Sequence, residues 1–419
     1  MRFLLLLCLL GFLQSPLPQS RFEWEAAGRK LYSEKHYAES ADAFRQAVKN
    51  GDRTANTRYN LACSLALAGK ADDALACLAS AIRAGYSARS HMESDSDLNS
   101  LHNDRRWQTA LDDCKKMAEA RNARMSDPEK AQINIENLRR FWRAFEAARK
   151  DSPQDWANAC ATRYLRDADG PLTYMIARAK MNPAKFAKMV ETKKEYFTFL
   201  DRHQQDFASQ ASALRAAFRK FKAMYADARF PDTYVMIGGF NSGGTTNDDG
   251  LLIGAELFGR YPDTPMQELG DWQKRVLIPA SGFVPLAVHE CAHYQQKPIL
   301  NQNLLAQTII EGSADFVSYL VTGEMPERTR NLHFWGNSRE REIWLQFQKE
   351  MDGESTAGWL YGNPKPDWPD DVGYWLGFKI CESYYGRAED KAKALKEILT
   401  TTNPKAFLEA SHYADKFGS

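Results

Sequence analysis

The chain has 419 residues, enough for two or three domains with an ample hydrophobic core. Its 55 Lys and Arg residues balance 54 Asp and Glu residues. Charge therefore gives no reason to expect binding to nucleic acid or to an anionic membrane.

The first twenty residues have the pattern of an export signal. Arg2 provides the positive charge, Phe3–Leu13 is the apolar stretch, and a polar tail reaches Ser20. The apolar stretch is short for a bilayer, and no later stretch is long and apolar enough to cross one. We therefore expect a signal peptide over residues 1–20 and an exported protein, periplasmic or secreted.

Residues 21–120 contain a repeat with a period of about 34 residues. Small residues recur at matching places in the two units, so two antiparallel helices can pack closely. The matching pairs are Gly28/Ala62, Ser40/Ala74 and Ala47/Ala81. This pattern resembles tetratricopeptide repeats. It favours a surface that docks a partner, or a structural cap on the rest of the chain.

The middle of the chain is expected to be helical. A polar stretch around Asp127-Pro128 predicts a linker over residues 121–132. Apolar residues then recur at helical spacing, which predicts a helical subdomain over residues 133–230. The six cysteines that follow the signal are scattered, so we expect mostly buried thiols, with Cys63 and Cys77 as the one pair that could bridge a hairpin.

The pattern changes at Pro231, where residues 231–419 are expected to form a separate domain. Tyr234–Ile237 is predicted to be a strand, and Leu251–Leu257 a returning antiparallel strand. The glycine-rich residues between them predict a turn. An edge strand at this place could hold an extended peptide by strand addition. The alternative is an ordinary sheet with a Gly-rich loop.

The strongest chemical signal is His289-Glu290-Cys291-Ala292-His293, an HExxH motif. On a helix, residues four apart share one face, so both imidazoles can reach one metal ion. Glu290 then lies beside them and can address a water molecule. The alternative is that the motif is a chance match on a buried helix and binds no metal.

A second motif, Glu311-Gly312-Ser313-Ala314-Asp315, follows in a predicted helix capped by Asn303 and ended by Gly323. Two carboxylates inside so apolar a helix are costly to bury unless they are paired. Zinc would pair with Glu311, and Asp315 would accept a hydrogen bond from a ligand histidine. His333 and His412 are expected to be structural.

These residues predict a zinc site with the ligands His289, His293 and Glu311, and with Glu290 as general base. Tyr374 is the candidate donor to the oxyanion, with a core tyrosine as the alternative. The expected reaction is hydrolysis of a peptide bond.

HExxH followed by Glu-x-x-x-Asp resembles the gluzincin metallopeptidases. More closely, roughly residues 130–416 resemble a family of predicted zinc-dependent proteases related to gliding-motility lipoproteins. The matching features are Phe141-Trp142, the Gly-rich hairpin, both motifs above, and Gly373-Tyr374 to Gly377. The resemblance implies the same three zinc ligands and a catalytic Glu290. It departs from thermolysin, because there is no Asn before Glu311.

The expected fold is mostly α with a small β-sheet, with helical repeats before a zincin-like domain. The expected function is that of an exported zinc metallopeptidase acting on a peptide or protein, with the repeats docking a partner. The alternatives are a repeat-based binding scaffold with a degenerate zinc domain, and a zinc hydrolase for a non-peptide amide.

Overall fold

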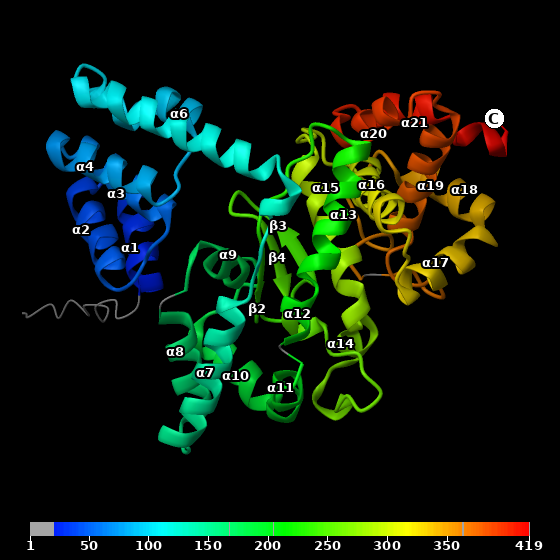
Figure 1. Cartoon of the computed structure of the whole chain (residues 1–419), viewed down its shortest axis with the longest axis horizontal. Coiled ribbons are helices and arrows are strands. Elements are labelled where there is room, and N and C mark those ends of the chain that lie inside the picture. Colours follow the sequence, from blue (N-terminus) through cyan, green and yellow to red (C-terminus); the bar gives the residue numbers. More distant parts are fainter. Residues whose placement is uncertain (1–20, 167, 204, 363, 419) are drawn as a thin grey trace, which may run out of the picture. The chain divides into compact units, whose positions relative to one another are not determined.

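The computed structural model describes residues 21–166, 168–203, 205–362 and 364–418. The expected signal segment, residues 1–20, lies outside them. The chain is mostly α-helical with one four-stranded sheet, which confirms the expected fold class (Figure 1). It divides into two compact units, one ending at Ala118 and one beginning at Glu119. No described helix has the length and apolar character needed to cross a membrane.

The described part of the first unit starts with two helical hairpins. They consist of α1 Arg21–Ser33 and α2 Tyr37–Lys49, followed by α3 Ala55–Leu67 and α4 Ala71–Arg83. Small residues let α1 and α2 approach closely. A methyl group added at Gly28 would lie 2.8 Å from the Phe44 ring. The Ser40 hydroxyl donates to the carbonyl of Gly28 at 2.9 Å.

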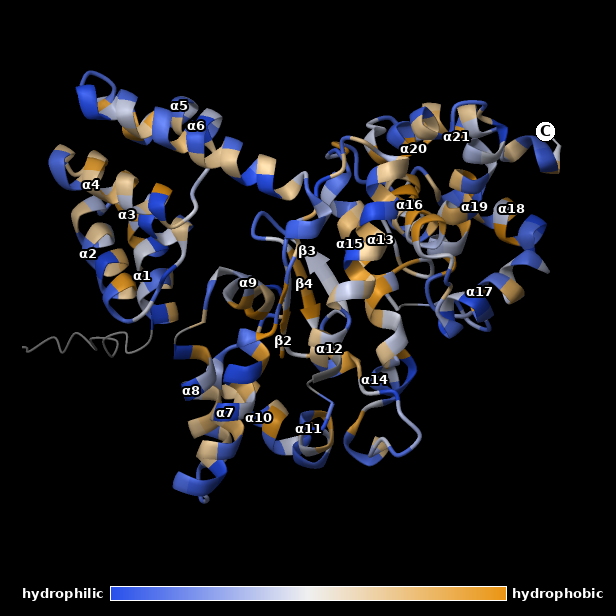
Figure 2. Ribbon diagram, in the orientation of Figure 1, coloured by the Kyte–Doolittle hydropathy of each residue, from blue (hydrophilic) through white to orange (hydrophobic). Residues whose placement is uncertain are grey.

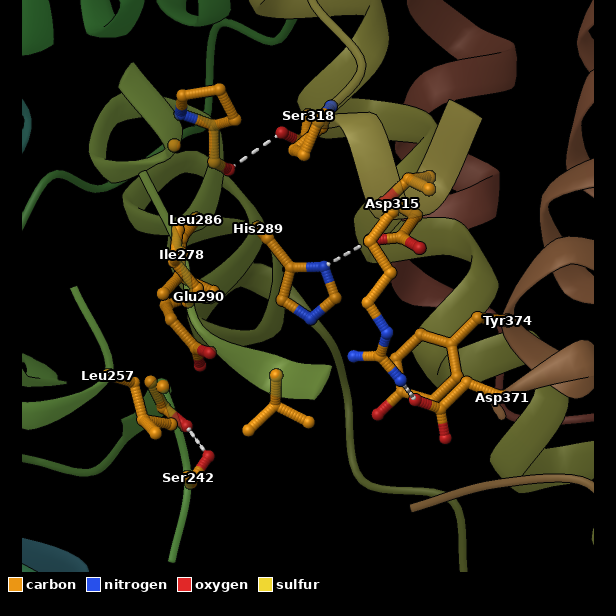
Figure 3. A pocket seen from close by; sticks show the side chains of 18 of the residues that line it. Ser242, Leu257, Ile278, Leu286, His289, Glu290, Asp315, Ser318, Asp371 and Tyr374 are labelled. Carbon is orange, nitrogen blue, oxygen red and sulfur yellow. Dashed lines mark hydrogen bonds and ion pairs between the residues drawn. The ribbon is translucent and has the colours of Figure 1, made fainter. Parts of the chain in front are cut away.

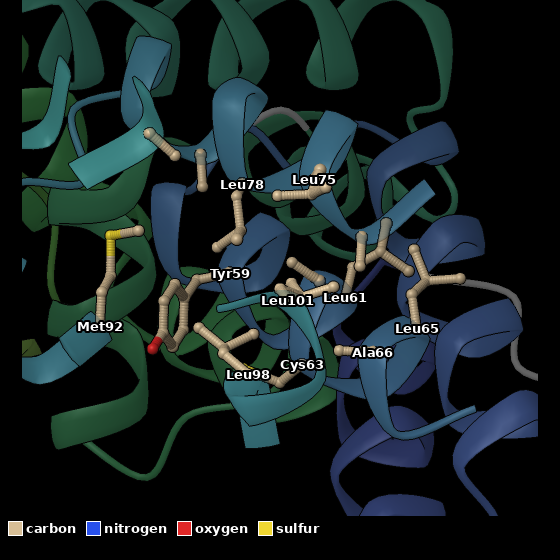
Figure 4. Packing of buried hydrophobic residues seen from close by; sticks show 14 of the residues in the cluster. Tyr59, Leu61, Cys63, Leu65, Ala66, Leu75, Leu78, Met92, Leu98 and Leu101 are labelled. Carbon is tan, nitrogen blue, oxygen red and sulfur yellow. The ribbon is translucent and has the colours of Figure 1, made fainter. Parts of the chain in front are cut away.

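The rest of this unit continues the same core. It contains α5 Arg89–Ser94, the 3-10 turn η1 Ser96–Leu101, and the start of α6 Arg105–Met125. Leu98 and Leu101 pack with the buried residues of α3 and α4 (Figure 4). Trp107 and Leu111 belong to the same core. Cys63 and Cys77 are both free, and five of the six described cysteines are buried.

The second unit opens differently from the sequence prediction. The predicted linker, residues 121–132, forms the end of α6, the 3-10 turn η2 Pro128–Lys130 and an extended link. Ile133–Asn134 is then a short strand, β1, so residues 133–230 are not wholly helical. The helices that follow are α7 Glu136–Asp151, α8 Trp156–Arg166, α9 Gly170–Arg178, α10 Pro183–Thr192, α11 Lys194–Asp201, α12 Gln205–Ser209 and α13 Ala211–Met224.

The sheet corrects the predicted antiparallel hairpin. The strands are β2 Thr233–Met236, β3 Gly244–Thr246 and β4 Leu251–Gly254, in the order β1-β2-β4-β3. β2 and β4 are parallel, and the glycine-rich segment between them contributes β3, which pairs antiparallel with β4. All four β4 residues are buried, as a strand with neighbours on both sides requires. Figure 2 shows the contrast between the apolar β4 and the less apolar β3.

Helices surround the remaining core of this unit. They are α14 Asp271–Val276, α15 Phe283–Gln295, α16 Leu304–Thr322, α17 Glu327–Asn337, α18 Glu340–Glu350, α19 Val372–Arg387, α20 Lys391–Thr400 and α21 Pro404–Ser411. Short 3-10 turns lie at Ala255–Leu257, Met266–Glu268, Ala280–Gly282 and Ala414–Phe417. α16 packs against both α15 and α19. These three helices position the site.

Candidate metal centre

Helix α15 presents the first motif toward a cavity. Its apolar back is fully buried at Val288, Cys291 and Ala292, which fixes how the helix is rotated. His289 and His293 are therefore held on the opposite face, one turn apart. The helix ends at Gln295. Pro298 follows soon after and disfavours a helical conformation at Lys297, the residue before it.

Helix α16 presents the second motif, with the predicted ends. The Asn303 side chain accepts the backbone N–H of Ala306 at 2.9 Å, and Gly323 ends the helix with φ 73°. Glu311 and Asp315 lie one turn apart on the face toward α15. Packing of the two helices therefore brings both motifs together, although residues 296–303 separate them in the chain.

The three predicted ligands converge. The Nε2 atoms of His289 and His293 lie 3.0 Å apart. The Glu311 carboxylate oxygen Oε2 lies 3.6 Å from Nε2 of His289 and 3.3 Å from Nε2 of His293. Ligand atoms on a tetrahedral zinc ion are separated by roughly 3.3–3.5 Å, given the usual zinc–ligand bond lengths. The donor set and its spacing fit zinc.

Hydrogen bonds fix which nitrogen of each imidazole carries the proton. The Nδ1–H of His289 donates a hydrogen bond to the carboxylate of Asp315, with 2.8 Å between Nδ1 and Oδ1. Nδ1 of His293 lies 2.8 Å from Oε1 of Gln296. The Gln296 amide nitrogen is committed elsewhere, because it donates to the carbonyl of Ile310 at 2.8 Å. Oε1 must therefore accept from His293.

This arrangement leaves both Nε2 lone pairs aimed at one point. In neutral imidazoles protonated at Nδ1, two lone pairs 3.0 Å apart would repel each other. The Glu311 carboxylate adds negative charge to the same point. Such a group of acceptors is stable only around a cation, whether a metal ion or a bound proton.

The neighbouring charges shift the pKa values of His289 and Glu311. Burial acts to lower the pKa of His289, but its hydrogen bond to Asp315 and the nearby Glu311 carboxylate outweigh burial and raise that pKa. Burial acts to raise the pKa of Glu311, but attraction to the neighbouring His293 and His289 holds it well below its usual range. Negative charge is thus in excess around the imidazoles.

Glu290 lies beside this group and outside it. Its side chain is buried, and burial raises the pKa of the carboxyl group. It packs against β3: a methyl group added at Gly244 would lie 2.4 Å from its Oε1. Figure 3 shows Glu290 on one side of His289, near Ser242 and Leu257, and Asp315 on the other. The carboxylate therefore stands between the ligand group and the edge strand.

Two phenols face the same cavity. The Tyr374 ring centroid lies 6.4 Å from that of His289, nearly parallel to it. Tyr361, from the loop before α19, reaches further: its hydroxyl lies 3.2 Å from Oε1 of Glu311 and 2.7 Å from Oε1 of Gln307. Tyr361 could not be identified from the sequence, because it lies in a loop without a recognisable motif. Its position depends on the loop conformation, in which Tyr361 has φ 64°.

Gln296 was also missed, although a signal existed. It lies three residues after His293, a spacing that returns to the same face of a helix. His333 and His412 lie outside the ligand group, as expected. His333 packs against the Phe378 ring, and His412 is paired with Asp415 at 2.8 Å.

A second group with metal-ligand character lies in the first unit, at Cys63, Asp95 and Asp97. Its carboxylates are already satisfied. Asp95 accepts from the Tyr59 hydroxyl at 2.7 Å, and Asp97 accepts from the Tyr32 hydroxyl. Burial raises the pKa of the Cys63 thiol. We read this group as a structural hydrogen-bond network.

Replacing Gln296 with leucine is expected to weaken zinc binding by about 10–100-fold, because His293 loses the acceptor that orients it. Competition with a chromophoric chelator measures the affinity. Gln302→Leu is the control, because the Gln302 amide contacts Ile299 and Gln307 and no member of the ligand group. Equal affinities for both variants would contradict the assigned role of Gln296.

The comparisons place this architecture in a family. The model of the family described as gliding motility protein GldB, labelled GldB_lipo, matches residues 121–415. The match covers more than half of the chain, including both motifs, and the chain belongs to this family. No curated protein and no solved structure matches it.

Proposed function

We propose that this chain is a zinc-dependent peptidase of the gluzincin type. The observation that carries the proposal is the pair of imidazole Nε2 lone pairs directed with Glu311 at one point, with Glu290 beside them. A purely structural zinc site is closed by four protein ligands and needs no buried carboxylate next to it. Three ligands with an adjacent general base are typical of catalytic sites.

Each residue has a separate task in this proposal. Zinc, when bound, polarises a carbonyl group and lowers the pKa of a coordinated water molecule to about 7. His289, His293 and Glu311 hold the ion, while Asp315 and Gln296 fix the imidazole tautomers. Glu290 takes the proton from water and delivers it to the leaving amine. Burial favours this role, because it raises the carboxyl pKa toward the working pH.

The edge strand supplies a place for the substrate backbone. β3 pairs only with β4 among the described strands. The carbonyl of Gly243 accepts from Gly254 at 3.0 Å, and Asn247 donates to Gly250 at 3.1 Å. By antiparallel alternation, the backbone groups of Gly244 and Thr246 face away from β4. An extended peptide can add there, along a cavity of about 700 Å³ that β3 lines together with the ligand group.

Replacing Tyr361 with phenylalanine is expected to lower kcat by about 10²–10³-fold, because a donor to the developing oxyanion is lost. Tyr374→Phe is expected to have a smaller effect, and Tyr374 remains a candidate donor. Tyr319→Phe is the control, since Tyr319 lines the same cavity without bonding to the ligand group. A kcat for Tyr361→Phe equal to that of the control would remove Tyr361 from the mechanism.

The helical hairpins of the first unit suit a docking role for a protein partner or substrate. The second helices of the two hairpins begin at the spacing of tetratricopeptide repeats, α2 at Tyr37 and α4 at Ala71. The family relation fits a protein associated with the cell envelope. We infer a periplasmic or secreted location from this relation and the predicted export segment; fractionation of cells that express the chain tests it, and a cytoplasmic pool alone would contradict it.

Incubation of the purified protein with a mixed peptide library tests the proposed activity. We expect cleavage that stops after treatment with a chelator and returns when zinc is restored. Cleavage that survives complete metal removal would refute a zinc mechanism. Stoichiometric zinc without cleavage of any peptide would favour the non-catalytic scaffold or a hydrolase for another amide.

A further inference from the structure

Arg178 is held at the edge of the cavity by the packing of its helix. It is the last residue of α9, and its side chain lines the cavity together with His289 and Glu290. The end of α9 packs against the turn that precedes β3. A methyl group added at Gly238 would lie 2.5 Å from Met175, and one at Gly239 would lie 2.9 Å from Met181. The backbone at Arg178 is therefore positioned by the segment that leads into the edge strand.

Arg178 differs from the other arginines of this cavity in having no carboxylate partner among the described residues. Arg260 is paired with Glu327 at 3.3 Å, and Arg328 with Asp371. Their charges are therefore already compensated. The guanidinium of Arg178 keeps its donors for a ligand, and its planar shape matches a carboxylate.

Its charge acts where the reaction would occur. Arg178 lines the same cavity as the Glu290 carboxylate, the Tyr361 phenol and the ligand group. A negatively charged group held by Arg178 would therefore lie in the cavity where the bond is cleaved.

We propose that Arg178 binds a carboxylate of the substrate close to the scissile bond, so that the preferred substrates are acidic peptides. This inference rests on the proposed peptidase function and names its substrate class. The carboxylate can come from an Asp or Glu side chain, or from the C-terminus of a short peptide. Both sources present the same planar anion to the guanidinium.

Binding to a protein that cannot hydrolyse separates recognition from chemistry. The zinc-loaded Glu290→Gln variant is first applied to an array of random hexapeptides. Calorimetry then measures its binding to matched pairs of peptides. One pair differs by Glu against Gln, and the other by a free against an amidated C-terminus. We expect the acid of at least one pair to bind about 10–100-fold tighter, the range for a charge-assisted, partly desolvated contact. The pair that responds identifies the source of the carboxylate.

Substitutions then assign the preference to one side chain. Arg178→Ala in the Glu290→Gln background is expected to abolish the difference, and Arg178→Lys to retain part of it. Arg260→Ala is the matched control, since Arg260 lines the same cavity but is already paired, and the difference should persist. In the active protein, Arg178→Ala should raise KM for the acidic peptide more than it raises KM for the neutral analogue.

Two results would overturn the assignment. One is equal binding of acidic and neutral peptides, or no binding at all, by the protein with Arg178 intact. The other is an acidic preference that survives Arg178→Ala. The proposed function fails separately: an acidic preference that depends on Arg178, without hydrolysis by the wild type, would leave a carboxylate-binding site and no peptidase.

Discussion

Replacing Glu290 with glutamine is expected to leave zinc bound and to lower kcat by about 10²–10⁴-fold or more. Glutamine has nearly the same shape, so it fits beside Gly244, but it cannot accept the proton of the attacking water. Loss of a buried carboxylate also removes a desolvation cost, so folding should not suffer. Zinc content, the thermal transition and kcat on one cleaved peptide are the measurements.

A matched control isolates the general base from the charge of the cavity. Glu324 is an exposed carboxylate that lines the same cavity and lies outside the ligand group. Glu324→Gln makes the same chemical change and is expected to stay within a few-fold of wild type. If Glu290→Gln and Glu324→Gln retained similar turnover, Glu290 would not be the base.

Replacing Gly377 with alanine is expected to destabilise the fold strongly, because two helix backbones meet there. A methyl group at Gly377 would lie 1.9 Å from the carbonyl oxygen of Thr308 in α16. One at Gly312 would lie 2.3 Å from the Gly377 Cα. Neither backbone can yield without moving Glu311, which is adjacent to Gly312. We expect a loss of about 1–3 kcal/mol or more in the free energy of unfolding.

Gly386 provides the control in the same helix. Apart from its chain neighbours and the backbone of its own helix, no heavy atom lies within 4 Å of the position its Cβ would occupy. Gly386→Ala should therefore stabilise the protein, by up to about 1 kcal/mol, through helix propensity alone. Unfolding of the second unit in urea measures the change in the free energy of unfolding for both variants. A Gly377→Ala variant as stable as Gly386→Ala would show that the two helices are not in backbone contact.

The helices that carry the ligands could be predicted from the sequence because their signals are local. Asn303 and Gly323 mark the ends of α16, and the four-residue spacing of His289 and His293 needs only helical geometry. The ligand group then follows from two short motifs. The fold class was equally accessible, since apolar residues recur at helical spacing through most of the chain.

The sheet could not be predicted in the same way, because strand pairing depends on distant residues. β1 has two residues, and β3 is a three-residue strand of Gly and Thr without apolar alternation. The turn-rich segment therefore concealed the edge strand, and β2 and β4 became parallel neighbours instead of a hairpin. The partners of Gly244 and Tyr361 likewise depend on tertiary packing that no sequence spacing encodes.

The zinc content of the purified chain is the most direct test of the central claim that His289, His293 and Glu311 form a metal site. After reconstitution and gel filtration, elemental analysis should find about one zinc per chain in the wild type. His293→Ala, which removes one ligand and keeps the helix, should lose most of it. Full zinc occupancy in His293→Ala, or none in the wild type, would contradict the account.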